Sequence, residues 1–134
     1  WEQAVGERES RMREVGVIIG FDGKPLHWHS DGTSSGWIPD RHSLWEAFWS
    51  NRVSMMGFAH SHPGGGIPGP SATDRITFAA AESGVGKRLF WYIVSSEHTA
   101  LVYYAGPGRL DYRVAQIPDP EWAGALRDAS NAEV

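Results

Sequence analysis

Two histidines, a serine and an aspartate in one short stretch of the chain have the types and spacing to hold a metal ion. His60 and His62 are two residues apart, so on a β-strand their side chains point to the same face. A turn rich in glycine and proline follows, and Ser71 and Asp74 then fall in the first turn of an expected helix. Two imidazoles and one carboxylate leave the fourth position of a tetrahedral zinc open to water, which is typical of a catalytic centre. We therefore expect His60, His62 and Asp74 to bind one zinc ion.

Each of these residues also has an ordinary structural interpretation. Ser71 is a good helix N-cap, and Asp74 in the first turn is favoured by the helix dipole. His60 and His62 could be polar positions at the end of a strand. These interpretations do not explain why a strand end, a turn and a cap coincide with a complete ligand set.

The pattern His-x-His-Pro, a short turn and Ser-x-x-Asp resembles the signature of the JAMM/MPN zinc metalloproteases, the Mov34/MPN/PAD-1 family, called JAB in prokaryotes. The resemblance covers roughly residues 12–105 and implies the same zinc ligands: His60, His62 and Asp74. It also implies that Ser71 supports the carbonyl oxygen or the zinc-bound water. The turn before Ser71 is one residue longer than the family pattern, which leaves open where its hydroxyl points.

The resemblance also implies a glutamate general base on a strand that precedes the motif. Glu14 opens the first apolar strand, and its surroundings are similar to the RadC branch of the family. In the eukaryotic-type register, counted back from Gly20, the base position falls on Arg13, one residue away. Glu7 and Glu9 are reserve candidates, and Glu14 could also simply end its strand in solvent.

A second group of metal-ligating residues is His27, His29 and Asp31, all on one face of an expected strand. At about 3.3 Å per residue, positions four apart lie about 13 Å from each other. Ligand atoms each about 2 Å from a zinc ion do not converge from such a line without a sharp bend. We expect these residues to lie at the surface.

Composition limits the classes of function. The chain has 134 residues, which fits one domain, and 41% of them are hydrophobic, which is enough for a core. The net charge of −4 gives no basic surface for nucleic acid, and the absence of cysteine excludes disulfides and thiolate ligands. No apolar run approaches the roughly 20 residues of a membrane span, and no signal peptide is present, so we expect no membrane partner and a cytoplasmic location.

Hydrophobic patterning predicts an α+β domain with a mixed β-sheet flanked by helices. The expected strands are 14–21, 24–29, 53–59, 89–94, 99–104 and 110–117, with 89–94 in the middle of the sheet. The expected helices are a lead-in over 1–12, then 40–51, a helix that runs from the Ser71 cap to Ser83 and ends at Gly84, and 118–129. Residues 30–39 read as a loop and 130–134 as a disordered tail.

Two helices are expected to bury a defined set of apolar side chains. In the helix over 40–51 the set is Leu44, Trp45, Phe48 and Trp49. In the helix after Asp74 it is Ile76, Ala79 and Ala80.

These expectations lead to a zinc-dependent peptidase or isopeptidase. The resemblance implies a substrate such as a ubiquitin-like protein or its conjugates, cleaved after a C-terminal glycine. In bacteria, such small domains resemble partners of ubiquitin-like conjugation or sulfur-carrier systems, which makes activating or conjugating enzymes expected partners. The alternatives are a non-catalytic MPN-type scaffold and a RadC-like protein of unknown substrate.

Overall fold

The computed structural model describes residues 15–30, 41–62, 70 and 72–131, which form a six-stranded sheet and three helices. The strands are β1 (Val15–Gly20), β2 (Pro25–Ser30), β3 (Met55–Ser61), β4 (Phe90–Val94), β5 (Thr99–Tyr104) and β6 (Tyr112–Ile117). The helices are α2 (Arg41–Asn51), α3 (Ala72–Val85) and α4 (Ala123–Asn131). Their order across the sheet is β2-β1-β3-β4-β5-β6. Only the β3–β4 pair is parallel, so the predicted α+β class with a mixed sheet is confirmed.

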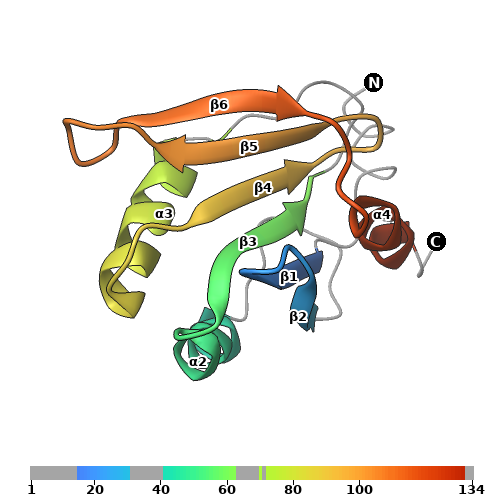
Figure 1. Ribbon diagram of the computed structural model, residues 1–134, viewed down its shortest axis with the longest axis horizontal. Helices are drawn as coiled ribbons and strands as arrows, with labels where there is room; N and C mark the ends of the chain where they lie inside the picture. Colours follow the sequence, from blue (N-terminus) through green and yellow to red (C-terminus); the bar gives the residue numbers. More distant parts are fainter. Residues whose placement is uncertain (1–14, 31–40, 63–69, 71, 132–134) are drawn as a thin grey trace, which may run out of the picture.

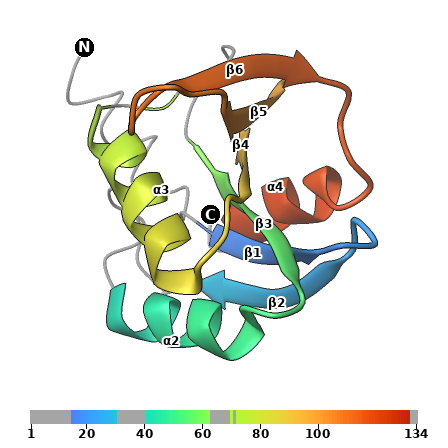
Figure 2. The same cartoon turned by 60° about the vertical axis from the view of Figure 1, so that its left-hand side comes forward.

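The sheet lies between two layers of helix (Figures 1 and 2). Helices α2 and α3 cover one face, where Phe48, Phe58, Phe78 and Trp91 form the centre of the larger core cluster. Helix α4 covers part of the other face, where Trp122 and its neighbours form a smaller cluster. Because β1 has helices on both sides, all six of its residues are buried. This explains why the strand reads as a continuous apolar run and not as an alternating one.

The strand predictions are correct in number and order, with shifts at their starts. The hairpin at Asp22 and Gly23 forms as expected: Gly23 has a positive φ of 78°, and β2 returns antiparallel to β1. Strand β3 begins at Met55 and not at Val53, which is 79% exposed in the preceding turn. Strands β4 and β6 begin one and two residues later than expected. The central position predicted for 89–94 is confirmed for β4.

The buried face of α3 differs from the predicted one. Of Ile76, Ala79 and Ala80, only Ala79 is buried, while Ile76 is 50% exposed. Phe78 decides the rotation of the helix, because its ring stacks on Trp91 at 4.3 Å between centroids. The buried residues of the helix are Phe78, Ala79, Ala81 and Glu82. Gly84 lies within the helix, and Gly86, with φ 82°, ends it.

The sequence patterns did not predict that Glu82 on α3 is buried, because a carboxylate is seldom buried. It accepts hydrogen bonds from Arg88 Nη1 at 2.9 Å, Leu89 N at 3.1 Å, Trp91 Nε1 at 3.0 Å and the Tyr112 hydroxyl. Burial and the hydrogen bond to Glu82 raise the pKa of Tyr112. This cluster joins the end of α3 to β4 and β6.

Two further expectations are corrected. Leu44 and Phe48 of α2 are buried as predicted and Trp45 packs against the core, but Trp49 is 57% exposed. The Arg52 guanidinium lies over the Trp49 ring, 3.8 Å from its centroid. The terminal helix runs over Ala123–Asn131, so the tail expected from residue 130 is wrong for Ser130, which is buried in α4.

The remaining expectations fall on residues 1–12, 31–39 and 132–134, which lie outside the described part of the chain. Among the described helices, none is both long and apolar enough to cross a bilayer.

Candidate metal centre

His60 lies on β3, in the middle of the sheet, and its side chain is fully buried. Burial, and after it the nearby His62, lower the pKa of His60 to about 3. The imidazole is therefore neutral at physiological pH, which is the state that binds metal.

The space beside His60 is shaped by Phe58 and Gly16. The Phe58 ring is nearly parallel to that of His60, with centroids 6.5 Å apart and an interplanar angle of 23°. Gly16 of β1 is the register partner of His60. A Cβ on Gly16 would lie 2.2 Å from Cζ of Phe58, so only glycine fits beneath this ring. Gly16 therefore helps to set the position of Phe58, and through it the surroundings of His60.

His62 follows directly after β3 and is half-buried. Its backbone N–H donates a 2.8 Å hydrogen bond to the carbonyl oxygen of Val94 at the end of β4. Its ring centroid lies 6.4 Å from that of His60, with an interplanar angle of 59°. Two imidazoles on one tetrahedral zinc, with Zn–N distances of ~2.0–2.1 Å, have centroids about 5 Å apart. The pair therefore fits a shared metal if one ring turns to bring them about 1 Å closer.

Ser61, between the two histidines, belongs to the opposite face of the strand. Its Oγ accepts a buried 2.9 Å hydrogen bond from the backbone N–H of Val15, the first residue of β1. This bond holds the start of β1 to the end of β3. Sequence reasoning assigned no role to Ser61. The only signal for this structural role is its position between the two histidines, which on a strand turns its side chain to the opposite face.

Asp74, the third expected ligand, lies in the first turn of α3 and is half-buried. Within the described residues, no group of three or more His, Asp or Glu side chains comes together as a metal site. Among the described residues, the structure therefore brings together His60 and His62 of the expected ligand set.

Several predicted site residues lie outside the described part of the chain: Glu14, Ser71, Asp31 and the reserve candidates Glu7 and Glu9. Of the rival group, His27 is exposed on β2, an edge strand, as expected for a surface residue.

A small cavity of about 60 Å³ adjoins His62 where β3 and β4 end against α4. It is lined by Ser61, His62, Val94, Ser95, Ser96, Arg127 and Ser130. The Arg127 Nε donates to the carbonyl oxygen of Ser95 at 2.8 Å. Its Nη1 and Nη2 bind both carboxylate oxygens of Asp119, at 2.7 and 3.1 Å. No motif pointed to Arg127, because this arrangement depends on how α4 returns to the sheet.

Comparison with known proteins gives no relative: no family model matches the chain, and no curated protein matches it at a significant level.

Proposed function

We propose that the chain is a zinc-dependent peptidase or isopeptidase of the JAMM/MPN type. The observation that carries the proposal is the pair His60 and His62 at the end of β3, with the start of β1 bonded to Ser61 between them. His60, His62 and Asp74 would hold the metal, and the proposed substrate is a ubiquitin-like protein or its conjugate, cleaved after a C-terminal glycine.

In this proposal the chain's own residues position the reactants and move protons. A zinc ion bound there would supply a Lewis acid and lower the pKa of a bound water. Glu14 would accept a proton from the attacking water and return it to the leaving amine. Glu14 directly precedes Val15 in the sequence, and the Val15 N–H is bonded to Ser61 between the two histidines. Ser71 would donate a hydrogen bond to the oxygen on which charge develops.

A scaffold of the same fold type is the second candidate. The observation that favours it is the lack of a group of three metal-ligating side chains in the described part of the chain. A scaffold would bind a partner without turning over a peptide bond. Metal content and turnover therefore separate the two proposals.

The test begins with elemental analysis of protein purified without added metal. We expect one zinc per chain in the wild type and loss of zinc in the double variant His60→Ala, His62→Ala. The matched control is His27→Ala, His29→Ala, which removes two histidines at the same spacing and should keep the metal. Equal zinc content in the wild type and the His60, His62 variant would refute the metal site.

Turnover is then measured on a ubiquitin fusion extended beyond its C-terminal glycine, with and without a zinc chelator. Cleavage that is lost with the chelator and restored by added zinc supports the enzyme. Zinc binding without cleavage of the fusion or of a panel of glycine-ended ubiquitin-like fusions favours the scaffold.

A further inference from the structure

Half of one face of the sheet is not covered by a helix in the described structure. Helix α4 contacts β1, β3 and β4, and the Tyr92 ring packs edge-on against Trp122, with centroids 5.1 Å apart. Beyond Tyr92, toward the start of β4 and the end of β5, the same face is open. Strand alternation places Phe90, Tyr92, Leu101 and Tyr103 on this face, and Met56 packs at the edge of the α4 cluster on the same face, as Tyr92 does. We call these five residues the open half of the sheet.

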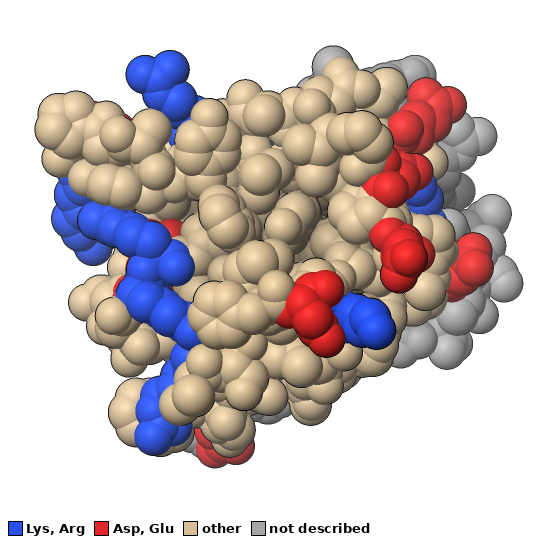
Figure 3. Space-filling view, in the orientation of Figure 1, with Lys and Arg blue, Asp and Glu red and all other residues tan. Residues whose placement is uncertain are grey.

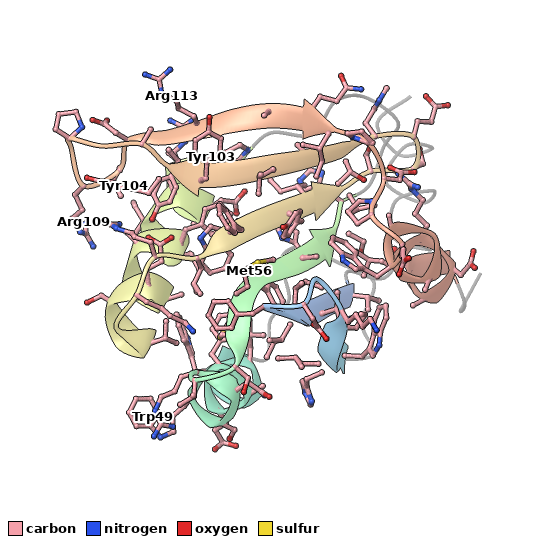
Figure 4. The ribbon with its side chains drawn as sticks, viewed as in Figure 1. Trp49, Met56, Tyr103, Tyr104, Arg109 and Arg113 are labelled. Atoms are coloured by element: carbon pink, nitrogen blue, oxygen red, sulfur yellow. The ribbon has the colours of Figure 1, made fainter. Side chains whose placement is uncertain are left out.

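The open half has the composition of an interface. Phe90 is 42% exposed, and the other four side chains are half-buried. Figure 3 views this face, and Figure 4 shows Met56 and Tyr103 on it. Aromatic residues and methionine are enriched where proteins bind one another, and a contiguous apolar patch marks such a site.

Charges of opposite sign lie at the two ends of the strands that carry the open half. At the end where β4 and β6 begin lie four basic residues: Lys87, Arg88, Arg109 and Arg113. At the other end, around the β4–β5 turn and the start of α4, lie Glu97, Asp119, Glu121 and Asp128. In Figure 3 most of the blue side chains lie along the left edge, and most of the red ones lie in the right half, where some blue is also visible.

Part of this charge is already neutralised within the chain. Arg88 pairs with Glu82, and Arg127 pairs with Asp119. Arg109 and Arg113 at the basic end, and Glu97 and Glu121 at the acidic end, form no ion pair within the described residues. These four residues leave each end with a net charge of its own sign.

A dimer with a two-fold axis accounts for three features together: the open half of the sheet, the opposite charges at its two ends and the position of α4. If the axis lies in the plane of the interface and perpendicular to the strands, each copy places its basic end opposite the acidic end of the other. The same rotation brings α4 of each copy over the open half of its partner. The outward residues of α4 include Gly124 and Ala125, which are exposed and small, and a Cβ on Gly124 would meet nothing within 4 Å. A helix with such small side chains can approach aromatic rings closely.

We propose that the partner for the open half is a second copy of this chain, in a symmetric dimer in which each α4 packs on the other copy's Phe90 and Tyr103. Such an isologous contact is closed, because the same surface of both copies is used. The dimer uses neither His60 nor His62, so it is independent of the proposed zinc site.

The charge pattern permits a sharp test by analytical ultracentrifugation. The basic-end variant is Arg109→Glu, Arg113→Glu, and the acidic-end variant is Glu97→Lys, Glu121→Lys. In a homodimer of either variant, like charges lie opposite one another at both ends of the interface. The dissociation constant of that homodimer should therefore rise at least tenfold relative to wild type. An equimolar mixture of the two variants should regain dimers, because every contact in the mixed dimer joins opposite charges.

The apolar contact is tested with Phe90→Ser, which should also weaken the dimer at least tenfold. Its control is Trp49→Ser, an exposed aromatic on α2, on the other face of the sheet, which should leave the dissociation constant unchanged. Circular dichroism of each variant verifies the fold. A wild type that stays monomeric up to high micromolar concentration overturns the proposal, and another occupant then takes this face. The proposal is also overturned if the dissociation constant of the dimer is unchanged by the charge-reversal variants or by Phe90→Ser.

Discussion

The backbone N–H of Val15 donates a buried 2.9 Å hydrogen bond to the hydroxyl oxygen of Ser61, 46 residues later in the chain. The bond lies on the face of β3 opposite to His60, and it joins the first residue of β1 to the strand that carries the histidines. Ser61 therefore stabilises the sheet and holds the first residue of β1 to the end of β3.

Replacement of Ser61 by alanine should leave the Val15 N–H buried without this partner. We expect a loss of about 1–3 kcal/mol in the free energy of unfolding, measured by urea denaturation. If residue 14 is the base, cleavage should fall further than the loss of folded protein explains. The control is Ser83→Ala on the exposed side of α3, which should change stability by less than about 0.5 kcal/mol. Equal effects of the two substitutions would contradict the role of Ser61.

Gly16→Ala tests the packing beside His60. The new Cβ would lie 2.2 Å from Cζ of Phe58 and 2.8 Å from Cε1, so the ring must move. Overpacking of this kind costs about 1–3 kcal/mol, and we also expect weaker zinc binding because Phe58 lies against His60. Calorimetric titration with zinc measures the second effect.

Its control is Gly84→Ala within α3, where a Cβ would meet nothing within 4 Å. Alanine favours a helix over glycine by about 1 kcal/mol, so this variant should be more stable than wild type and bind zinc equally. If Gly16→Ala binds zinc with unaltered affinity, the position of Phe58 does not influence the zinc site.

Glu82→Gln tests the buried carboxylate of α3. Four donors form hydrogen bonds to the carboxylate oxygens of Glu82. In glutamine an NH₂ group replaces one of these oxygens, so one or two of the donors would face another donor. We expect a loss of about 3 kcal/mol, because the substitution breaks a buried charged network. The matched control is Glu97→Gln, an exposed glutamate in the turn between β4 and β5, which should be nearly neutral. A Glu82→Gln protein as stable as the control would refute this account.

The sequence predicted what depends on local pattern. The continuous apolar run of β1, the Asp22-Gly23 turn and the alternation through His60 and His62 gave the sheet and the two adjacent imidazoles. The errors arose where tertiary contacts decide. Glu82 is buried because donors from β4 and β6, distant in sequence, meet at its carboxylate. The stacking of Phe78 on Trp91, also distant in sequence, sets the rotation of α3, so that Ile76 is exposed and Phe78 is not.

The site beyond the histidine pair could be predicted only as residue types. The role of Ser61 depends on the register between β1 and β3, and that of Arg127 on the return of α4 to the sheet. Residue spacing within one segment predicts neither the contact of Ser61 with Val15 nor that of Arg127 with Ser95, because the partners are far apart along the chain. For Glu14 and Ser71 the sequence pattern and the proposed chemistry remain the grounds of the assignment.

Acid should weaken one link between α4 and the sheet. Hydrogen bonds from Arg127 and then Thr99 lower the pKa of Asp119 to about 2. In the unfolded chain an aspartate has a pKa of about 3.9. The folded value is the lower one, so the stabilisation is present above about pH 4 and is lost as the pH falls toward 2. The melting temperature of Asp119→Asn should therefore lie below that of wild type at pH 6.

The difference between Asp119→Asn and wild type should shrink between pH 4 and pH 2. The comparison variant is Asp128→Asn, an exposed carboxylate on α4, whose difference from wild type should stay small throughout. A difference for Asp119→Asn that is constant from pH 6 to pH 2 would show that its charge is not what stabilises the contact.

Glu14→Gln tests the proposed general base. Amide and carboxylate are nearly the same size, so the variant should keep its fold and one zinc per chain. It should nevertheless cleave the ubiquitin fusion about 10²–10⁴-fold more slowly, because a positioned acid–base group contributes a factor of this order. The parallel variants Glu7→Gln and Glu9→Gln should retain activity, and each is compared at equal zinc content and thermal stability. If Glu14→Gln is fully active and Glu7→Gln or Glu9→Gln is not, the base lies earlier in the chain and the bond between Val15 and Ser61 has no part in placing it.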